Sequence, residues 1–125
     1  MILVDTSVWV DHLRVGDPHL VSLLDEGNVV IHPFVIGEIA LGTLAGRNAV
    51  LALLQDLPSA PVADSMEVLL FIERNAIAGR GIGYVDLHLL ASASLSADIT
   101  LWTRDRRLGN LAETLGCAHG HGSRN

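Results

Sequence analysis

The chain has 125 residues, half of them hydrophobic and only 18% charged. This length and composition suffice for one domain with a packed core and exclude a disordered protein. Eight arginines and no lysine stand against 14 acidic residues, and the formal net charge of −6 does not predict a nucleic-acid-binding protein. The charge argues only weakly against such a partner, because two bound divalent cations would change −6 to −2.

The start of the chain and its cysteine content indicate the compartment. Positions 1–10 contain no basic side chain and already carry Asp5, so they do not resemble a signal peptide. No uncharged apolar run approaches the roughly 18 residues of a membrane span. The single cysteine, Cys117, cannot form an internal disulfide, which fits a reducing compartment. We therefore expect a cytoplasmic protein that does not bind membranes.

The first half of the chain alternates apolar, strand-like runs with helical segments. The opening run MILVD, residues 1–5, is typical of a strand buried in a parallel sheet, and Thr6 or Ser7 would cap the next helix. A second strand is expected at residues 29–32, with Pro33 at the first position of a following helix. The helices predicted in this half are residues 6–13, 18–26, 34–44 and 48–57.

The second half continues this alternation. Asp64 and Glu67 have the spacing of a capping box, which predicts a helix that extends to about residue 78. The segment GRGIG, residues 79–83, lacks the GK[ST] ending of a phosphate-binding loop and is predicted to be a turn. The other predicted elements are helices at residues 84–97 and 106–115, a strand at 99–103, and short strands at 61–63 and 117–119. We expect residues 1–119 to form a single domain and residues 120–125 a flexible tail.

Strands that alternate with helices predict an α/β fold with three layers around a mostly parallel sheet. In such sheets, ligands bind beyond the carboxyl ends of the strands. Asp5 and Asp105 directly follow predicted strands. Glu38 and Asp86 lie in or near the first turns of predicted helices whose N-termini point toward the same edge. We therefore expect these four carboxylates to converge at that edge.

The four acids stand in apolar surroundings, where an unpaired carboxylate is costly. Glu38, for example, is the only charged residue between Gly27 and Gly46. Taken singly, Asp105 could be the N-cap of the helix that follows it, and Asp86 could merely interact favourably with a helix dipole. Four such residues in a chain without lysine are better explained by a shared site for a hard divalent cation.

The segments that carry these acids resemble PIN-domain ribonucleases of the VapC toxin type. The similarity lies in MILVDTSVWVDHL at the start, the acidic residue Glu38 in a helix, GYVDLHLLASA around Asp86, and LWTRDRRL around Asp105. It extends from residue 1 to about residue 115, with the same order and spacing. The resemblance implies a PIN-like three-layer α/β/α sandwich.

The resemblance also implies an activity, a cofactor and partners. The residues that would hold Mg²⁺, with Mn²⁺ as a substitute, are the catalytic acids Asp5, Glu38, Asp86 and Asp105. Thr6, Ser7 and Thr103 match the supporting hydroxyl positions of the family. The implied reaction is hydrolysis of RNA phosphodiester bonds by a metal-activated water, which leaves 3′-hydroxyl and 5′-phosphate ends. The implied partners are a second copy of the chain and a VapB-like antitoxin, whose apolar contact we place at residues 29–57.

Several arginines are candidate RNA contacts, because guanidinium groups suit phosphate oxygens. The candidates are Arg80, Arg104, Arg106 and Arg107. Each could equally be a solvated surface residue. Trp9, Tyr84 and Trp102 could stack on bases, but each lies in an apolar run, where packing in the core is the expectation.

Two other functional classes are alternatives. An aspartate-based phosphotransfer domain also gathers acids at strand ends, but it normally needs a lysine to neutralise phosphate. Dehalogenase-type enzymes also need a DxD motif, whereas Ser7 stands two residues after Asp5 here. A catalytically silent PIN-fold binding module is the second alternative. The intact set of four acids argues against it, and a metal-dependent nuclease assay would decide.

Overall fold

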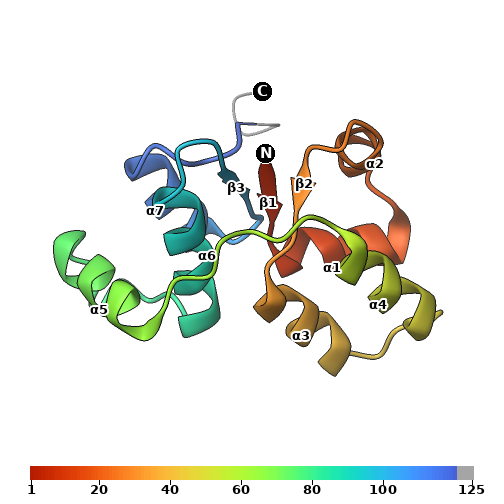
Figure 1. Ribbon diagram of the computed structural model, residues 1–125, viewed down its shortest axis with the longest axis horizontal. Coiled ribbons are helices and arrows are strands. Elements are labelled where there is room, and N and C mark those ends of the chain that lie inside the picture. Colours follow the sequence, from red (N-terminus) through yellow and green to blue (C-terminus); the bar gives the residue numbers. More distant parts are fainter. Residues whose placement is uncertain (121–125) are drawn as a thin grey trace.

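A small parallel sheet lies at the centre of the computed structural model, which describes residues 1–120 (Figure 1). The strands, in the order β2–β1–β3 across the sheet, are β1 (Ile2–Val4), β2 (Val29–Val30) and β3 (Thr100–Trp102). β1 pairs in parallel with both neighbours. Its residues Leu3 and Val4 are fully buried, as expected for a continuous apolar run at the centre of a parallel sheet.

Helices lie on both sides of the sheet, which gives three layers (Figure 1). On one side α6 and α7 contact β3 and each other, and α5 packs on α6. On the other side α3 contacts both α1 and α4. The helices are α1 (Thr6–Val15), α2 (Pro18–Asp25), α3 (Pro33–Leu41), α4 (Arg47–Asp56), α5 (Ser65–Arg74), α6 (Tyr84–Ser94) and α7 (Arg106–Thr114). The predicted α/β fold with a parallel sheet is confirmed.

Local signals in the sequence explain where several helices begin. The capping box predicted at the start of α5 is present, since Asp64 accepts from the Glu67 N–H and Glu67 accepts from the Asp64 N–H. Pro33 occupies the first turn of α3, where its missing N–H costs nothing. Asp17 caps α2 by accepting a hydrogen bond from the Leu20 N–H.

The core lies between the sheet and the two helical layers. Leu3 of β1, Leu101 of β3 and Leu108 of α7 are buried together with α6, which is buried continuously from Leu87 to Ala93. A helix that is buried on every side cannot shift without disturbing the core around it. Residues at the N-terminal end of α6 are therefore held in fixed positions relative to the sheet.

Several predicted features of the secondary structure are wrong. The first helix is capped by Asp5, and not by Thr6 or Ser7, because the Asp5 carboxylate accepts from the Thr6 N–H. The helix predicted to reach residue 78 ends at Arg74, since Ala76 adopts a φ of 50° that a helix does not allow. The helices predicted to end at residues 44 and 97 end earlier, as their bounds above show.

The prediction of a strand at residues 61–63 is also wrong. Pairing occurs earlier in the chain, as one isolated parallel bridge between Ile31 and Ser59. The Ile31 N–H donates to the Pro58 carbonyl, and the Ala60 N–H donates to the Ile31 carbonyl. Pro61 has no N–H with which to continue this ladder, which explains why the pairing stops.

The C-terminal part of the chain adds one more isolated pairing. The strand predicted at residues 117–119 is a single parallel bridge between Ala118 and Leu101. Apart from Gly120, the predicted tail at residues 120–125 lies outside the described residues. Within residues 1–120, no helix is long and apolar enough to cross a membrane.

Candidate functional site

The four acids singled out from the sequence lie at the carboxyl edge of the sheet or on the adjoining helices. Asp5 follows β1 and caps α1, and Asp105 follows β3 and caps α7. Asp86 lies in the first turn of α6. Glu38 lies in the second turn of α3, slightly farther from the helix N-terminus than predicted. The topology therefore brings residues from four separate segments to one region.

Electrostatic coupling shows that these acids share one neighbourhood. Burial, together with the negative charges of the other three acids, raises the pKa of Asp86 from its ordinary value of 3.8 to about 6. Asp86 lies at the N-terminal end of α6, where its side chain is only partly buried and remains accessible from solvent. The site is thus an open cluster of carboxylates that repel one another around Asp86.

Asp5 is the most tightly held of the four acids. It is 4% exposed, and its Oδ1 atom accepts from the Thr6 N–H at 2.7 Å. Its Oδ2 atom accepts from the Ser7 and Thr103 hydroxyls, both at 2.7 Å. The Asp5 N–H also donates to the Trp102 carbonyl, which ties the end of β1 to the end of β3. These bonds satisfy the buried carboxylate and fix its orientation.

Hydroxyl groups also connect the neighbouring acids. The Thr6 hydroxyl donates to Glu38 Oε1 at 2.6 Å, which links α1 to α3. The Thr103 hydroxyl accepts from the Asp105 N–H at 3.0 Å while it donates to Asp5. Asp105 Oδ1 accepts from the Leu108 N–H, so the capping role considered for Asp105 is real. The structure thus brings all three predicted hydroxyl residues into contact with the predicted acids.

The chemistry of this donor set suits a hard divalent cation. Carboxylate and hydroxyl oxygens are the ligands that Mg²⁺ prefers, and a cation would relieve the repulsion that raises the pKa of Asp86. The geometry is less complete, because within residues 1–120 no three Asp, Glu, His or Cys side chains are positioned to hold one ion. Metal binding at this edge would therefore require acidic side chains to rotate toward one another.

Comparison with known proteins agrees with this arrangement. A family model for the PIN domain matches residues 2–114, which is most of the chain. The chain belongs to the PIN-domain family. It is also 50% identical, over 108 residues, to Ribonuclease VapC32 of Mycobacterium tuberculosis, in strain CDC 1551 / Oshkosh and in strain ATCC 25618 / H37Rv. The aligned part covers 86% of this chain and 87% of each relative, so the resemblance to VapC-type PIN-domain proteins is confirmed.

Two of the four candidate RNA-binding arginines of this PIN domain have partners inside the protein. Arg104 forms ion pairs with Asp11 and Asp17, and hydrogen bonds to these carboxylates raise the pKa of its guanidinium above the ordinary value. Arg107 donates to the Gly81 carbonyl at 3.2 Å, which joins α7 to the turn at residues 79–83. These contacts leave both side chains less suited to phosphate than predicted.

The other two arginines are exposed. Arg80 and Arg106 form no ion pair with any residue in the part of the chain that the structure describes. Both remain predicted RNA contacts. The turn that contains Arg80 is confirmed, and it needs a glycine at Gly81, where φ is +81° and a Cβ atom would lie 2.6 Å from Arg107 Nη1.

The aromatic residues divide between the core and the surface. Trp9 and Trp102 are 4% and 6% exposed, which confirms that they pack in the core. The same expectation is wrong for Tyr84, which is 59% exposed at the first position of α6 and two residues before Asp86. Tyr84 is therefore available to contact a ligand at the carboxyl edge.

A pair of buried histidines beside this edge was not found from the sequence. His32 is fully buried and caps α3, since its Nδ1 atom accepts from the Phe34 N–H. Its ring centroid lies 6.1 Å from that of the buried His88 on α6. Burial, together with His88, lowers the pKa of His32 to about 4, so His32 is neutral at neutral pH. The place of His32 directly before Pro33 is a sequence signal for a helix cap. No sequence motif indicates that His32 lies beside His88.

Proposed function

We propose that this PIN domain is a Mg²⁺-dependent endoribonuclease that acts as a toxin in the cytoplasm and is neutralised by a cognate antitoxin. The observation that supports the proposal best is the raised pKa of Asp86, which is caused by burial and by the charges of the other three acids. The name Ribonuclease carried by the 50%-identical relatives supports the same activity. A silent binding module would have no use for this costly cluster.

The chain's own residues account for the parts of the proposed reaction. Asp5, Asp86, Asp105 and Glu38 would hold the metal. When bound, Mg²⁺ supplies a water of lowered pKa and neutralises charge on the leaving oxygen. Thr103 and Ser7 keep the Asp5 carboxylate in place through their hydroxyls. Because RNA is an anion, the acidic cluster alone repels it, and a bound cation reverses that charge.

The surface around α1, α3 and α4 supports the proposed antitoxin contact. A cavity of about 540 Å³ extends from Glu38 along Leu13 and Leu44. A second cavity, of about 310 Å³, also contacts Leu13 and is lined by Leu53 and Leu57. An apolar segment of the antitoxin could fill these cavities and place a basic side chain against Glu38. The proposed contact therefore includes α1 as well as residues 29–57.

Expression of the wild-type protein alone should arrest bacterial growth, and RNA from the arrested cells should gain new 5′-phosphate ends. Co-expression of the small antitoxin should restore growth, because the antitoxin covers the acidic edge. Sequencing of 5′-phosphate RNA ends before and after induction measures the effect and identifies the cleaved RNA. The Asp86→Asn variant serves as the matched inactive control. Harmless accumulation of soluble, folded wild-type protein would contradict the toxin role.

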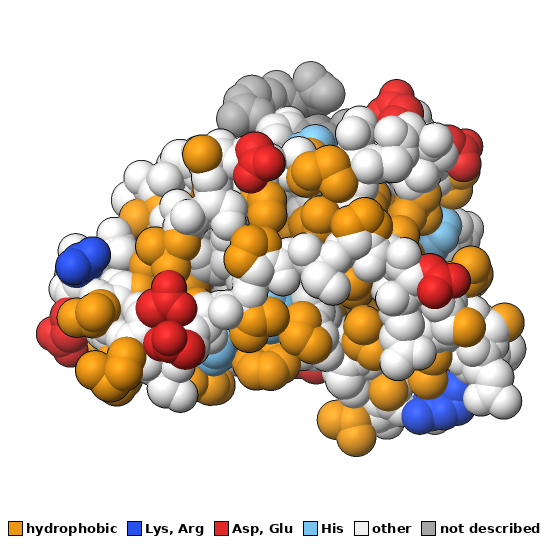
Figure 2. Space-filling model, in the orientation of Figure 1, with side chains coloured by type: hydrophobic (Ala, Val, Ile, Leu, Met, Phe, Trp, Pro, Cys, Tyr) orange, Lys and Arg blue, Asp and Glu red, His pale blue; other side chains and the backbone are white. Residues whose placement is uncertain are grey.

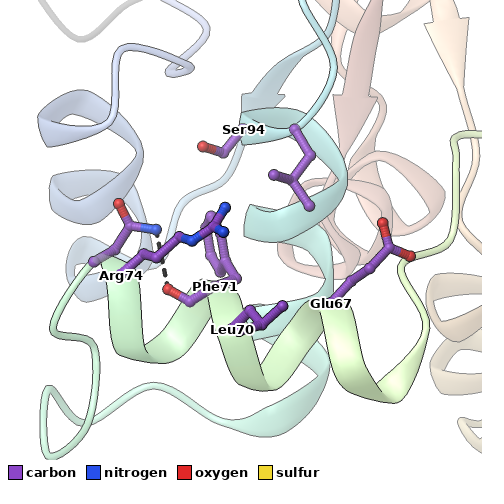
Figure 3. A pocket seen from close by; sticks show the side chains of 7 residues that line it. Glu67, Leu70, Phe71, Arg74 and Ser94 are labelled. Carbon is purple, nitrogen blue, oxygen red and sulfur yellow. Dashed lines mark hydrogen bonds between the residues drawn. The ribbon is translucent and has the colours of Figure 1, made fainter.

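We also propose that the protein forms a homodimer through α5. Met66 and Leu69 on this helix are 66% and 57% exposed, and hydrophobic side chains gather over α5 in Figure 2. A groove of about 340 Å³ lies between α5 and α6. Figure 3 shows Glu67 and Arg74 toward opposite ends of the groove, with Leu70 between them. If two α5 helices packed antiparallel about Leu70, each Glu67 would face the Arg74 of the other copy, as an isologous interface requires.

A Leu70→Glu substitution should convert the dimer into a monomer, because it places an unpaired charge at the centre of this interface. Leu70 is 49% exposed, so thermal stability at low protein concentration should change little. Sedimentation equilibrium measures the association. Val15→Glu, at a residue 75% exposed on α1, is the matched control and should remain dimeric. A Leu70→Glu protein that is still dimeric would exclude this surface.

A further inference from the structure

Arg104 connects the segment before Asp105 to two helices. Its Nη1 atom donates to Asp11 Oδ2 on α1, and its Nη2 atom donates to Asp17 Oδ2 at the start of α2. The guanidinium carbon also lies 5.9 Å from the centre of the Trp102 ring. The planar guanidinium therefore spans two carboxylates from separate elements, which a single point charge could not do with the same geometry.

The backbone of the same segment is attached to the start of α1. The Arg104 N–H donates to Ser7 Oγ at 3.1 Å, and Ser7 Oγ donates to Asp5 at 2.7 Å. The Thr103 hydroxyl donates to the same Asp5 oxygen. The backbone of the segment from Thr103 to Asp105 is thus held at the start of α1. The Arg104 side chain holds the same segment to the middle of α1 and to the start of α2.

These contacts matter more for local order than for overall stability. Arg104 and Asp11 are 38% and 34% exposed at their side chains, and exposed ion pairs add little to the stability of a fold. Asp105 itself is exposed and is the third residue after β3, so without further contacts its backbone would be free to move. Catalytic groups lose much of their effect when they are displaced by about 1 Å.

We propose that Arg104 is a positioning residue, which holds the Thr103–Asp105 segment against α1 and α2 so that Asp105 faces the other three acids. This role replaces the RNA contact expected from the sequence. Its catalytic consequence rests on the proposed ribonuclease function, whereas its structural consequence does not. The two roles also differ in what they affect: an RNA contact governs binding and its salt dependence, and a positioning residue governs turnover.

Arg104→Met removes the charge and keeps most of the apolar stem, so it tests the role directly. With a mixed-sequence fluorogenic RNA oligonucleotide and Mn²⁺, kcat should fall about 10- to 100-fold while KM stays within about twofold. Amide hydrogen exchange at residues 104, 105 and 108 should become at least about tenfold faster, because their N–H groups donate to Ser7, Thr103 and Asp105, and these bonds depend on the position of the segment. Arg14→Met is the matched control, since Arg14 pairs with Asp11 at 3.2 Å from within α1, and it should behave like the wild type.

Removing the partners of Arg104 provides an independent check. Asp11→Asn/Asp17→Asn keeps a capping side chain on α2 and leaves Arg104 in place. This variant should reproduce the changes in kcat and in hydrogen exchange that Arg104→Met shows. Combining all three substitutions in one protein should lower kcat and speed exchange no further than either variant does. If Arg104→Met does not fold, Arg104→Lys replaces it and should show smaller changes of the same kind.

A different set of results would overturn the proposal. Arg104 would be assigned to RNA binding if the variant had a raised KM and unchanged hydrogen exchange. In that case the slope of log RNA-binding affinity against log salt concentration should also be smaller by about one. Unchanged exchange at all three amides would by itself reject the positioning role. If the wild type cleaves no RNA, the ribonuclease function fails, and the exchange measurement still decides whether Arg104 orders this segment.

Discussion

Asp86→Asn should abolish RNA cleavage in Mg²⁺, with a rate loss of about a hundredfold or more, while the protein unfolds at the same or a higher temperature. Cleavage should be lost because the amide removes an anionic ligand from the centre of the acidic cluster. Stability should not fall, because the charge of Asp86 is opposed by burial and by the three neighbouring acids, which raise its pKa to about 6. Single-turnover cleavage and thermal melts measure the two effects.

Two further variants make this result specific. Asp5→Asn should lose cleavage equally but should also lose about 1–3 kcal/mol of stability, because its carboxylate accepts three hydrogen bonds that an amide cannot all accept. Asp98→Asn changes an exposed acid and should alter neither property. If Asp86→Asn and Asp105→Asn both cleave RNA at near the wild-type rate, the assignment of the site is wrong.

Lowering the pH from 7.5 to 5 should stabilise metal-free wild-type protein relative to Asp86→Asn. The pKa of Asp86 is about 6 in the folded protein, against an ordinary value of 3.8, so between these values the folded state binds more protons than the unfolded state. The contribution of Asp86 to stability therefore rises as the pH falls through 6 and levels off near 4. Because the side chain is only partly buried, we expect a relative gain of roughly 1 kcal/mol.

The comparison with Asp86→Asn is needed because His32 titrates in the opposite sense. Its pKa is lowered to about 4, so the unfolded state binds the proton more tightly and stability is lost as the pH falls from about 6.5. This contribution is common to both proteins and cancels in the difference. Urea denaturation at several pH values supplies the free energies of unfolding. A difference between the two proteins that does not vary with pH would refute the coupling of the four acids.

Binding of a divalent metal ion to Asp86 and its neighbouring acids should also raise the stability of the protein. At pH 7.5 and ten times Kd, Mn²⁺ should stabilise the wild type by about 1.4 kcal/mol, and EDTA should remove the gain. The gain should be smaller at pH 5, because protons and metal compete for the same oxygens. An undiminished Mn²⁺ effect in Asp5→Asn/Asp86→Asn would show that the metal binds elsewhere.

The position of the acids was predictable because it follows from topology. Parallel strands end at one edge of a sheet, so the acids that follow β1 and β3 must approach each other once both strands pair side by side. The capping box at Asp64 was predictable because its two residues are neighbours in sequence. The capping role of Asp105 was also visible, and it coexists with the proposed role at the site.

The interactions that the sequence did not reveal join residues far apart in the chain. The motif TRDRR shows an arginine beside an acid, but not that Arg104 turns away to Asp11 and Asp17 on the N-terminal helices. His32 and His88 have no common motif, and only the packing of α6 brings them together. The exposure of Tyr84 was missed, although the helix start was predicted, because an apolar run does not show which of its side chains other elements cover.

The central claim is that four acids form one metal site around Asp86, and calorimetric titration of Mn²⁺ at pH 6 tests it most directly. Asp86 is about half protonated at this pH, because its pKa is about 6. Titrations in two buffers of different ionisation enthalpy should therefore show release of about half a proton per bound ion. In Asp86→Asn, binding should weaken at least about tenfold and the release should disappear. Equal affinity and equal proton release in the two proteins, or no binding to the wild type, would contradict the claim.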